Sequence, residues 1–221
     1  MNKFIIKKEK SYYEQAYESI KQMIFNKIFE SGENISDTKL SEQFNISRSP
    51  IREALRSLEK EGLLIKDGKR FKVYEPTKED VAELFECREA LEFMAVRLAV
   101  ERASDDELSE LEMVLKKAEN VLEKTDPDWD ENIILINTQF HDLILKYSKN
   151  TRIQNQLNTL NSLIYFYRTI NLSEKNRCDE IHAQHVEILE FMKRRDIKKA
   201  SESMLKHIED DLSHIQKLID K

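Results

Sequence analysis

The sequence predicts a mostly α-helical protein in two parts. A small N-terminal part with two short strands precedes a larger antiparallel all-helical bundle. The composition points this way, because the 221 residues include only 3 glycines and 3 prolines and 35% of them are charged. Apolar residues also recur at helical spacing, and no long stretch alternates between apolar and polar as a strand would.

An uneven distribution of charge supports a division near residue 76. Residues 1–76 hold 15 lysines and arginines against 12 acidic residues, a net of +3, whereas the remainder holds 21 against 30, a net of −9. Pro76 disfavours helix just before it, and Thr77 can cap a helix that follows. We therefore predict one domain over residues 1–76 and a second over residues 77–221, with different partners because their charges differ in sign.

The first domain shows three helical patterns followed by a hairpin. Helices are predicted over about 13–29, over 38–44 with Asp37 as its cap, and over 47–62. Two short apolar segments within 63–74 flank an Asp-Gly turn, which is typical of a hairpin. Three helices and a two-stranded hairpin in this order make a winged helix-turn-helix domain.

The third predicted helix carries a stripe of arginines beside a stripe of aliphatic residues. At 100° per residue, Arg48, Arg52 and Arg56 fall within about 80° of one another. The aliphatic stripe can be buried while the guanidiniums reach guanine edges or phosphate oxygens in a major groove. Two alternatives stay open, namely a basic stripe that is only a solvated helix face and a winged helix that contacts proteins.

The segment LSEQFNISRSPIREALRSLEKEGLL resembles the DNA-binding signature of the GntR family of bacterial transcription regulators, over most of residues 12–75. The resemblance implies that Arg48 and Arg52 contact bases of double-stranded operator DNA. It also implies that Ser49, Pro50 and Gly68 lie near the DNA.

One residue departs from this signature. Many family members carry an arginine where this chain has Thr38. The resemblance therefore implies that one base contact is missing or is replaced by Lys39, so that the operator need not follow the commonest family consensus. Arg56, one turn beyond the base readers, is better placed for phosphate, and Lys69 in the wing can reach the minor groove or the backbone.

The second domain is predicted to be an antiparallel bundle of six helices. Apolar periodicity and capping residues place these helices over 78–102, 105–124, 128–148, 151–170, 174–194 and 196–219.

Three histidines lie on three different helices of this bundle: His141, His185 and His207. Asn137 precedes His141 by four residues and therefore shares its helix face. If these side chains converge inward, they form a site of three nitrogens and one oxygen that suits a divalent transition metal. The alternative is that each histidine is a surface or core residue without a ligand. His182 and His214 are expected to be exposed and without function.

The second domain resembles the all-helical effector-binding FCD domain of the FadR-like branch of GntR regulators. The residues that carry this likeness are CREALEFMAVRLA, NTQFHDLIL and AQHVEILEFMKRRDIKKASESMLKHI. The resemblance implies a metal of the zinc, nickel or manganese type, bound by the three histidines. Asn137 stands where many members have aspartate, and a neutral amide is a weaker ligand than a carboxylate.

The same resemblance implies an effector pocket. Arg88 matches an arginine that faces the effector in relatives, and a guanidinium beside a metal would hold a carboxylate from two sides. Tyr165 and Arg168 are further candidates on the fourth helix of the bundle. From the residues alone, Arg88 could equally form a salt bridge within the bundle.

These expectations describe a cytoplasmic, ligand-responsive transcription regulator rather than an enzyme. It would bind a palindromic operator as a homodimer, repress by default, and respond to a small organic acid. Four alternatives remain: a metal-free pocket for an acyl or other apolar ligand, a sensor of the metal itself, a metal-dependent enzyme, and a winged helix for protein contacts. The absence of an apolar run of about 20 residues argues against a membrane span.

Overall fold

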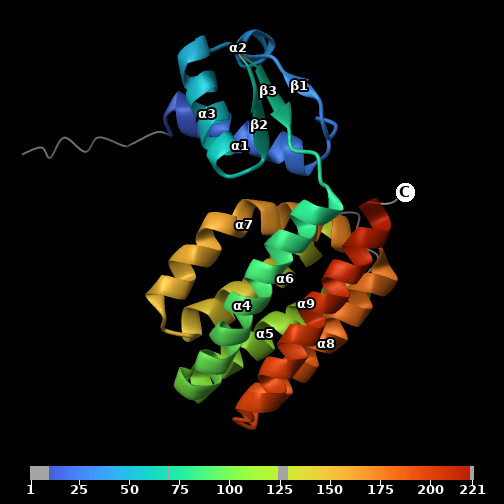
Figure 1. Ribbon diagram of the computed structural model, residues 1–221. Helices are drawn as coiled ribbons and strands as arrows, with labels where there is room; N and C mark the ends of the chain where they lie inside the picture. Colours follow the sequence, from blue (N-terminus) through green and yellow to red (C-terminus); the bar gives the residue numbers. More distant parts are fainter. Residues whose placement is uncertain (1–9, 69, 124–128, 220–221) are drawn as a thin grey trace, which may run out of the picture. The chain divides into compact units, whose positions relative to one another are not determined.

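The computed structural model describes residues 10–68, 70–123 and 129–219, and Figure 1 shows their arrangement. The chain divides between Glu75 and Pro76 into two compact units. Lys69, the expected wing contact, lies outside the described residues. No helix in the described ranges is long and apolar enough to cross a membrane.

The first unit has three helices and a small antiparallel sheet. Its elements are α1 (Tyr12–Phe25), β1 (Asn34–Ile35), α2 (Asp37–Phe44), α3 (Arg48–Lys60), β2 (Leu64–Asp67) and β3 (Arg70–Val73). The strand order is β1-β3-β2, with Ile35 paired to Phe71 and Leu64 paired to Val73. The strand β1 was not predicted, because two residues are too few to show a periodic pattern.

Local chemistry sets where the first helices begin and end. Ser11 and Glu14 form a capping box at the start of α1. This helix ends at Phe25 rather than at the predicted Phe29, because Lys27 adopts a left-handed backbone conformation, with φ of 55°. The residue that caps α2 is Ser36, whose hydroxyl accepts from the Lys39 amide, so the prediction of Asp37 as the cap was wrong.

The aliphatic stripe of α3 packs against α1. Ile51, Ala54, Leu55 and Leu58 are fully buried, and the facing residues of α1 are the buried Ala16, Ile20 and Ile24. Burying this stripe fixes the rotation of α3 about its axis, and so the neighbouring, arginine-bearing side stays in water.

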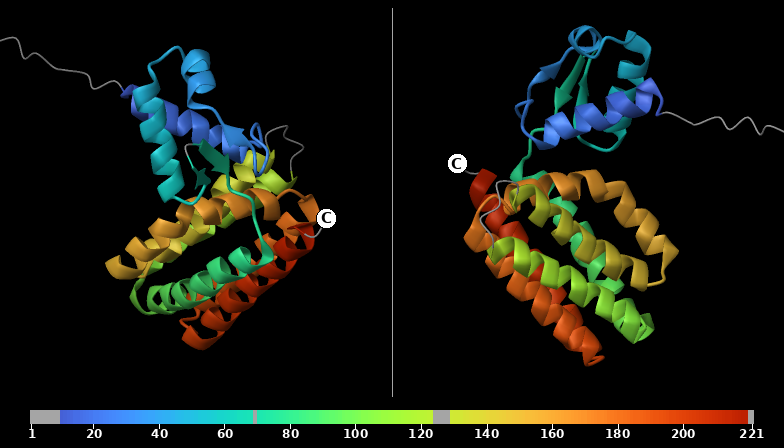
Figure 2. Two further views of the ribbon diagram at one scale, coloured as in Figure 1. Left: turned by 45° about the horizontal axis from the view of Figure 1, so that its top comes forward. Right: turned by 180° about the vertical axis from the view of Figure 1, so that it is seen from behind.

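The second unit consists of helices in its described part. They are α4 (Lys78–Arg102), α5 (Asp105–Glu123), α6 (Trp129–Tyr147), α7 (Thr151–Asn171), α8 (Lys175–Lys193) and α9 (Ile197–Ile219). Each lies within one residue of its predicted bounds at either end. Figures 1 and 2 show α4 and α9 side by side and antiparallel, and α9 also packs along α8. The predicted fold class, a winged helix-turn-helix followed by a helical bundle, is confirmed.

The interior of this bundle is not purely apolar. Polar and charged side chains from five helices are buried at its centre, among them Arg88, Glu92, Asn137, His141, Arg168, His185, His207 and Asp211. Buried charges are stable only when they are paired or neutralised, so this region is where chemistry is to be expected.

Candidate functional sites

The first candidate site is the exposed side of the first unit. Arg48, Arg52 and Arg56 are exposed along one side of α3, and Ser49 and Pro50 lie in its first turn. A winged helix-turn-helix domain places this end of the helix at base edges in the major groove.

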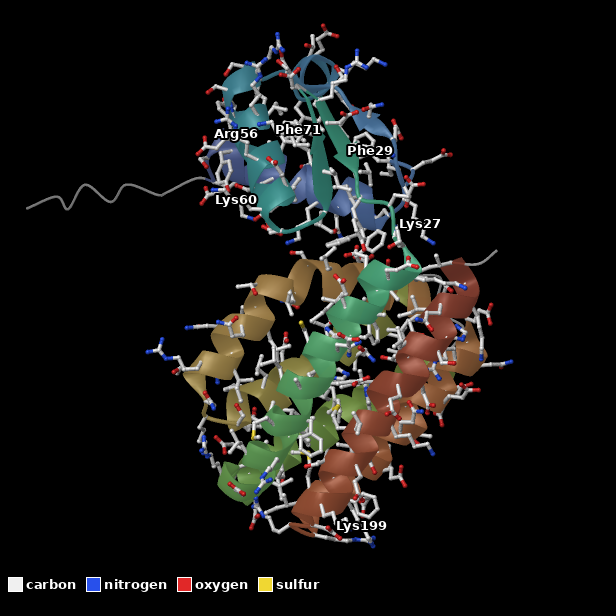
Figure 3. The ribbon with its side chains drawn as sticks, viewed as in Figure 1. Lys27, Phe29, Arg56, Lys60, Phe71 and Lys199 are labelled. Atoms are coloured by element: carbon white, nitrogen blue, oxygen red, sulfur yellow. The ribbon has the colours of Figure 1, made fainter. Side chains whose placement is uncertain are left out.

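A groove runs from the helices of this unit to its wing. It is lined by residues of α2 and α3, including Lys39, Arg52 and Arg56, and by Lys66, Gly68 and Arg70 of the wing. Figure 3 labels Arg56 on α3 and Phe71 on β3, which both line the groove. The structure therefore brings Lys39, Arg52, Arg56 and Gly68 together, while Arg48, Ser49 and Pro50 lie outside the groove lining.

One acidic residue of this surface was missed by sequence reasoning. Asp37 accepts hydrogen bonds from Arg48 Nη2 at 2.8 and 2.9 Å and from Arg52 Nε at 2.5 Å. Partial burial works to raise the pKa of Asp37, but the two guanidiniums lower it below its ordinary value. The spacing of these residues along the chain does not indicate this contact, because Asp37 lies on α2 and the two arginines lie on α3, beyond the turn at Asn45.

The second candidate site is the buried histidine cluster of the bundle. His141 on α6, His185 on α8 and His207 on α9 offer nitrogen atoms that all lie within 4.8 Å of one another. Nε2 of His185 and Nε2 of His207 are 3.3 Å apart. The predicted convergence of the three imidazoles is thus present, and Asn137 is buried one turn before His141, beside a cavity that His185 also lines.

Two side chains orient these imidazoles from behind. Glu92 Oε2 lies 2.7 Å from His141 Nδ1, and Gln184 Oε1 lies 2.8 Å from His207 Nδ1. Since a carboxylate or amide oxygen can only accept here, both Nδ1 atoms carry the proton, and each Nε2 keeps its lone pair. Metal-binding histidines are commonly held in this way.

Burial keeps the histidines neutral. It lowers the pKa of His141, lowers that of His185 further, and lowers that of His207 to about 4. Neutral imidazole is the form that binds a metal ion. The chemistry of the donor set and its protonation therefore fit a divalent transition metal.

Two arginines lie beside the cluster. Arg88 donates from Nε to Glu92 Oε1 at 2.8 Å and lies 3.7 Å from Asp211 Oδ2, so it does form the salt bridge that the sequence left as an alternative. Its Nη2 atom nevertheless has no partner. Arg168 has two buried nitrogens without a partner, Nε and Nη1, and burial together with nearby Arg88 lowers its pKa to about 10.

A cavity opens next to these groups. Its polar lining consists of Glu92, His141, Asp142, Asn158, Asn161 and Arg168, and the rest of its lining is apolar residues of α4, α6, α7 and α9. Its free volume is about 30 Å³, which is room for one or two water molecules. Tyr165 does not line this cavity, since it packs against the apolar cluster around Ile133 and Leu172.

Asp211 joins the site to a second group of buried polar residues. It accepts from Asn171 Nδ2 at 2.6 Å and from Arg177 Nη2 at 2.8 Å, and its other oxygen lies 3.6 Å from His207 Nε2. Sequence reasoning missed Glu92, Asp211 and Gln184. Glu92 and Asp211 follow Arg88 and His207 by four residues, and this spacing could have indicated them.

Two further histidines differ from expectation. His182 and His214 are partly buried rather than exposed, and each has one ring nitrogen without a partner. Neither belongs to the group whose nitrogens converge.

Comparison with known proteins identifies the class to which these two sites belong. Residues 12–73 match the family model of bacterial regulatory proteins of the gntR family, and residues 83–210 match that of the FCD domain. The chain therefore belongs to the GntR family of bacterial transcription regulators and carries an FCD domain, so the resemblance drawn from the sequence is confirmed.

Individual relatives agree with this assignment. An uncharacterised HTH-type transcriptional regulator of Bacillus subtilis (strain 168), YdhC, is 36% identical over all of this chain and 98% of its own length. The HTH-type transcriptional regulator McbR of Escherichia coli (strain K12) is 33% identical over 65% of this chain and 66% of its own. Its solved structure, titled E. coli McbR/YncC, matches with a TM-score of 0.76 and 23% identity, and covers 95% of this chain and 99% of that one. The family and these relatives are transcription regulators, not enzymes.

Because of its buried histidine cluster, the folded bundle is expected to lose stability as the pH falls. The pKa of His207 falls from 6.5 in the unfolded chain to about 4 in the folded one. Between these values the unfolded chain takes up a proton that the folded chain does not, so the stabilising contribution is complete above pH 6.5 and is lost as the pH falls toward 4. For His207 alone the loss is at most about 3 kcal/mol.

Urea unfolding of metal-stripped protein from neutral pH down to about pH 5 measures this loss. The variant His207→Gln should show a shallower dependence of the unfolding free energy on pH. An unchanged pH dependence in this variant would contradict the assignment.

Proposed function

We propose that this GntR-family protein is a ligand-responsive repressor. It binds a palindromic operator as a homodimer through α3 and the wing. It binds a small organic acid next to a divalent metal ion held by Asn137, His141, His185 and His207. Relatives named as repressors, of the gluconate operon in Bacillus licheniformis and NanR in Salmonella newport, support repression as the default.

The arrangement of charge supports a division of roles on the DNA. Arg48 and Arg52 stand in the first two turns of α3, the part that reaches base edges in such domains. Arg56 lies further along α3 and lines the groove with Lys66 and Arg70 of the wing, where phosphate oxygens are the natural partners. Lys39 lines the same groove. It is the candidate to replace the base contact of the arginine that many family members have at the position of Thr38. A C2 dimer presents two such surfaces, which is why a palindrome is expected.

One distance carries the metal proposal. Two nitrogens bound to one zinc ion at 2.0–2.1 Å with tetrahedral angles lie about 3.3–3.4 Å apart. The Nε2 atoms of His185 and His207 are 3.3 Å apart. When bound, such a metal polarises an oxygen ligand, and Asn137 would supply an amide oxygen where a carboxylate is more usual.

The buried arginines support an anionic effector. A buried N–H group without a partner destabilises the fold, and Arg168 has two such nitrogens while Arg88 has one. A carboxylate in the cavity that Arg168 lines can accept from the unpaired nitrogens of Arg168, whereas an acyl chain or other apolar ligand would leave them unpaired. This observation favours the acid over the apolar alternative.

The size of the cavity supports a link between binding and shape. A free volume of about 30 Å³ is too small for an organic acid, so α6, α7 and α9 must shift to admit one. An effector that prefers the expanded bundle changes the balance between two arrangements of the protein, and such differential affinity is what regulation requires.

Replacing a base reader should weaken sequence-selective DNA binding. We expect Arg48→Ala or Arg52→Ala to weaken binding to the DNA upstream of the protein's own gene by about 10- to 100-fold. Arg56→Ala should weaken binding to all sequences alike. It should also reduce the slope of the logarithm of affinity against the logarithm of salt concentration by about one. Fluorescence anisotropy at several salt concentrations measures both, with Arg194→Ala, exposed in the second unit, as the control. Wild-type protein that bound this DNA no better than a scrambled sequence would refute the role.

Removing one imidazole should remove the metal. Protein purified without a histidine tag is expected to hold about one divalent metal ion per chain, and His185→Ala should hold far less. His214→Ala serves as the matched control, because His214 is a partly buried histidine outside the cluster. Elemental analysis by mass spectrometry reads out the stoichiometry. Metal retained at one per chain in His185→Ala would rule out this ligand set.

Organic acids should stabilise the protein through Arg168. In a thermal-shift screen, carboxylic acids should raise the melting temperature, while the matching amides should not. Arg168→Met should remove the response, and Arg194→Met should keep it. If metal alone changed DNA affinity and no acid did so, the protein would instead be a sensor of the metal.

A further inference from the structure

The two arginines assigned to base reading share one carboxylate. Asp37, at the start of α2, accepts from Arg48 Nη2 through both of its oxygens, at 2.9 and 2.8 Å, and from Arg52 Nε at 2.5 Å. The Asp37 side chain is 22% exposed, compared with 48% for Arg48 and 55% for Arg52. The acid therefore lies beneath two guanidiniums that reach into solvent.

As an acid in the first turn of α2, Asp37 favours the N-terminus of that helix, but this role does not require contact with arginines on α3. The cap of α2 is Ser36. Within the part of the chain that the structure describes, Asp37 also accepts from the hydroxyl of Thr38, at 3.3 Å to Oδ1. Thr38 is the residue that replaces the arginine of many relatives, so the departure from the family pattern lies within this same cluster.

We propose that Asp37 is a positioning residue for DNA specificity, which holds Arg48 and Arg52 in a fixed relation so that they read neighbouring base pairs together. The inference rests on the proposed role of these two arginines as base readers. The inference goes further, because it explains why two flexible arginines would prefer particular bases.

The atoms left free support this role. Arg52 uses Nε for Asp37 and keeps both terminal amino groups, the pair that can reach O6 and N7 of one guanine. Arg48 uses Nη2 and keeps Nη1 and Nε. A guanidinium that is already held loses less conformational entropy on binding than a free one, so a matching base gains affinity.

The charge of Asp37 supports the same conclusion, because it acts on non-specific binding. Two arginines and one aspartate carry a net charge of +1, and a carboxylate between the guanidiniums repels phosphate oxygens. Affinity for the phosphate backbone is independent of sequence, so reducing it raises the ratio of specific to non-specific binding. Asp37 would thus increase selectivity partly by weakening the wrong complexes.

A selection from random DNA tests the inference. Full-length wild-type protein and Asp37→Asn are each used to enrich duplexes with a randomised central segment of about 20 base pairs. Affinities are then measured for the sequence that wild type selects and for a scrambled duplex of the same composition. Glu42→Gln is the matched control, because Glu42 is exposed on the same helix and the charge change is the same.

We expect Asp37→Asn to lower the ratio of specific to scrambled affinity by about tenfold or more, partly through tighter binding to the scrambled duplex. Glu42→Gln should leave the ratio within about twofold. Asp37→Glu keeps a carboxylate within reach of both guanidiniums and should restore most of the ratio. If Asp37→Asn does not fold, Asp37→Ser takes its place. It is compared with Arg52→Gln and with the double variant, and the effect of the change at 37 should shrink once Arg52 is gone.

Three results would overturn the inference. Unchanged affinities of Asp37→Asn for both duplexes would mean that the acid serves only the stability of α2. Tighter binding to specific and scrambled DNA by the same factor would mean that Asp37 merely masks the arginines. Failure of wild type to enrich any sequence would refute the base-reading role itself, and this inference with it.

Discussion

Burial of charge at the centre of the helical bundle is the constraint on which the rest of the second unit depends. Glu92 stands between Arg88 and His141, and burial works to raise its pKa while these neighbours hold the pKa well below the ordinary value. Asp211 plays the same part between Arg88 and Arg177. Each carboxylate ties together helices distant in sequence, so α4, α6, α8 and α9 cannot be repacked without leaving an ion unpaired.

This constraint also defines what the histidine cluster can do. An imidazole whose Nδ1 is bonded from behind presents one lone pair in one direction, and two of the three are oriented in this way. Stacking of Phe140 on His185, with ring centroids 4.2 Å apart, fixes the remaining ring. Such a cluster is rigid before any ligand arrives, whereas the neighbouring cavity is lined in part by apolar side chains, which form no directional bonds.

Much of the fold could be predicted from the sequence, because the apolar residues of a helix recur at a spacing that can be recognised. The six helices of the bundle and the aliphatic stripe of α3 follow from periodicity, and the three histidines could be singled out because they recur on separate helices. Contacts between elements could not be predicted. Asp37 resembled a helix cap, yet Ser36 takes that place, and the carboxylate of Asp37 meets arginines on the next helix. The contacts of Gln184 and Asp211 likewise could not be predicted, because they form only where α8 and α9 pack together.

The two unpaired nitrogens of Arg168 have a consequence for the life of the protein in the cell. Buried N–H groups without a partner lower the stability of the folded chain, and an anion that binds them raises that stability. Proteases digest the unfolded chain, so a molecule that holds its ligand survives longer than one that does not. If the proposed acid binds at Arg168, the abundance of the protein would then follow the concentration of that acid, a slower response than a change in DNA binding.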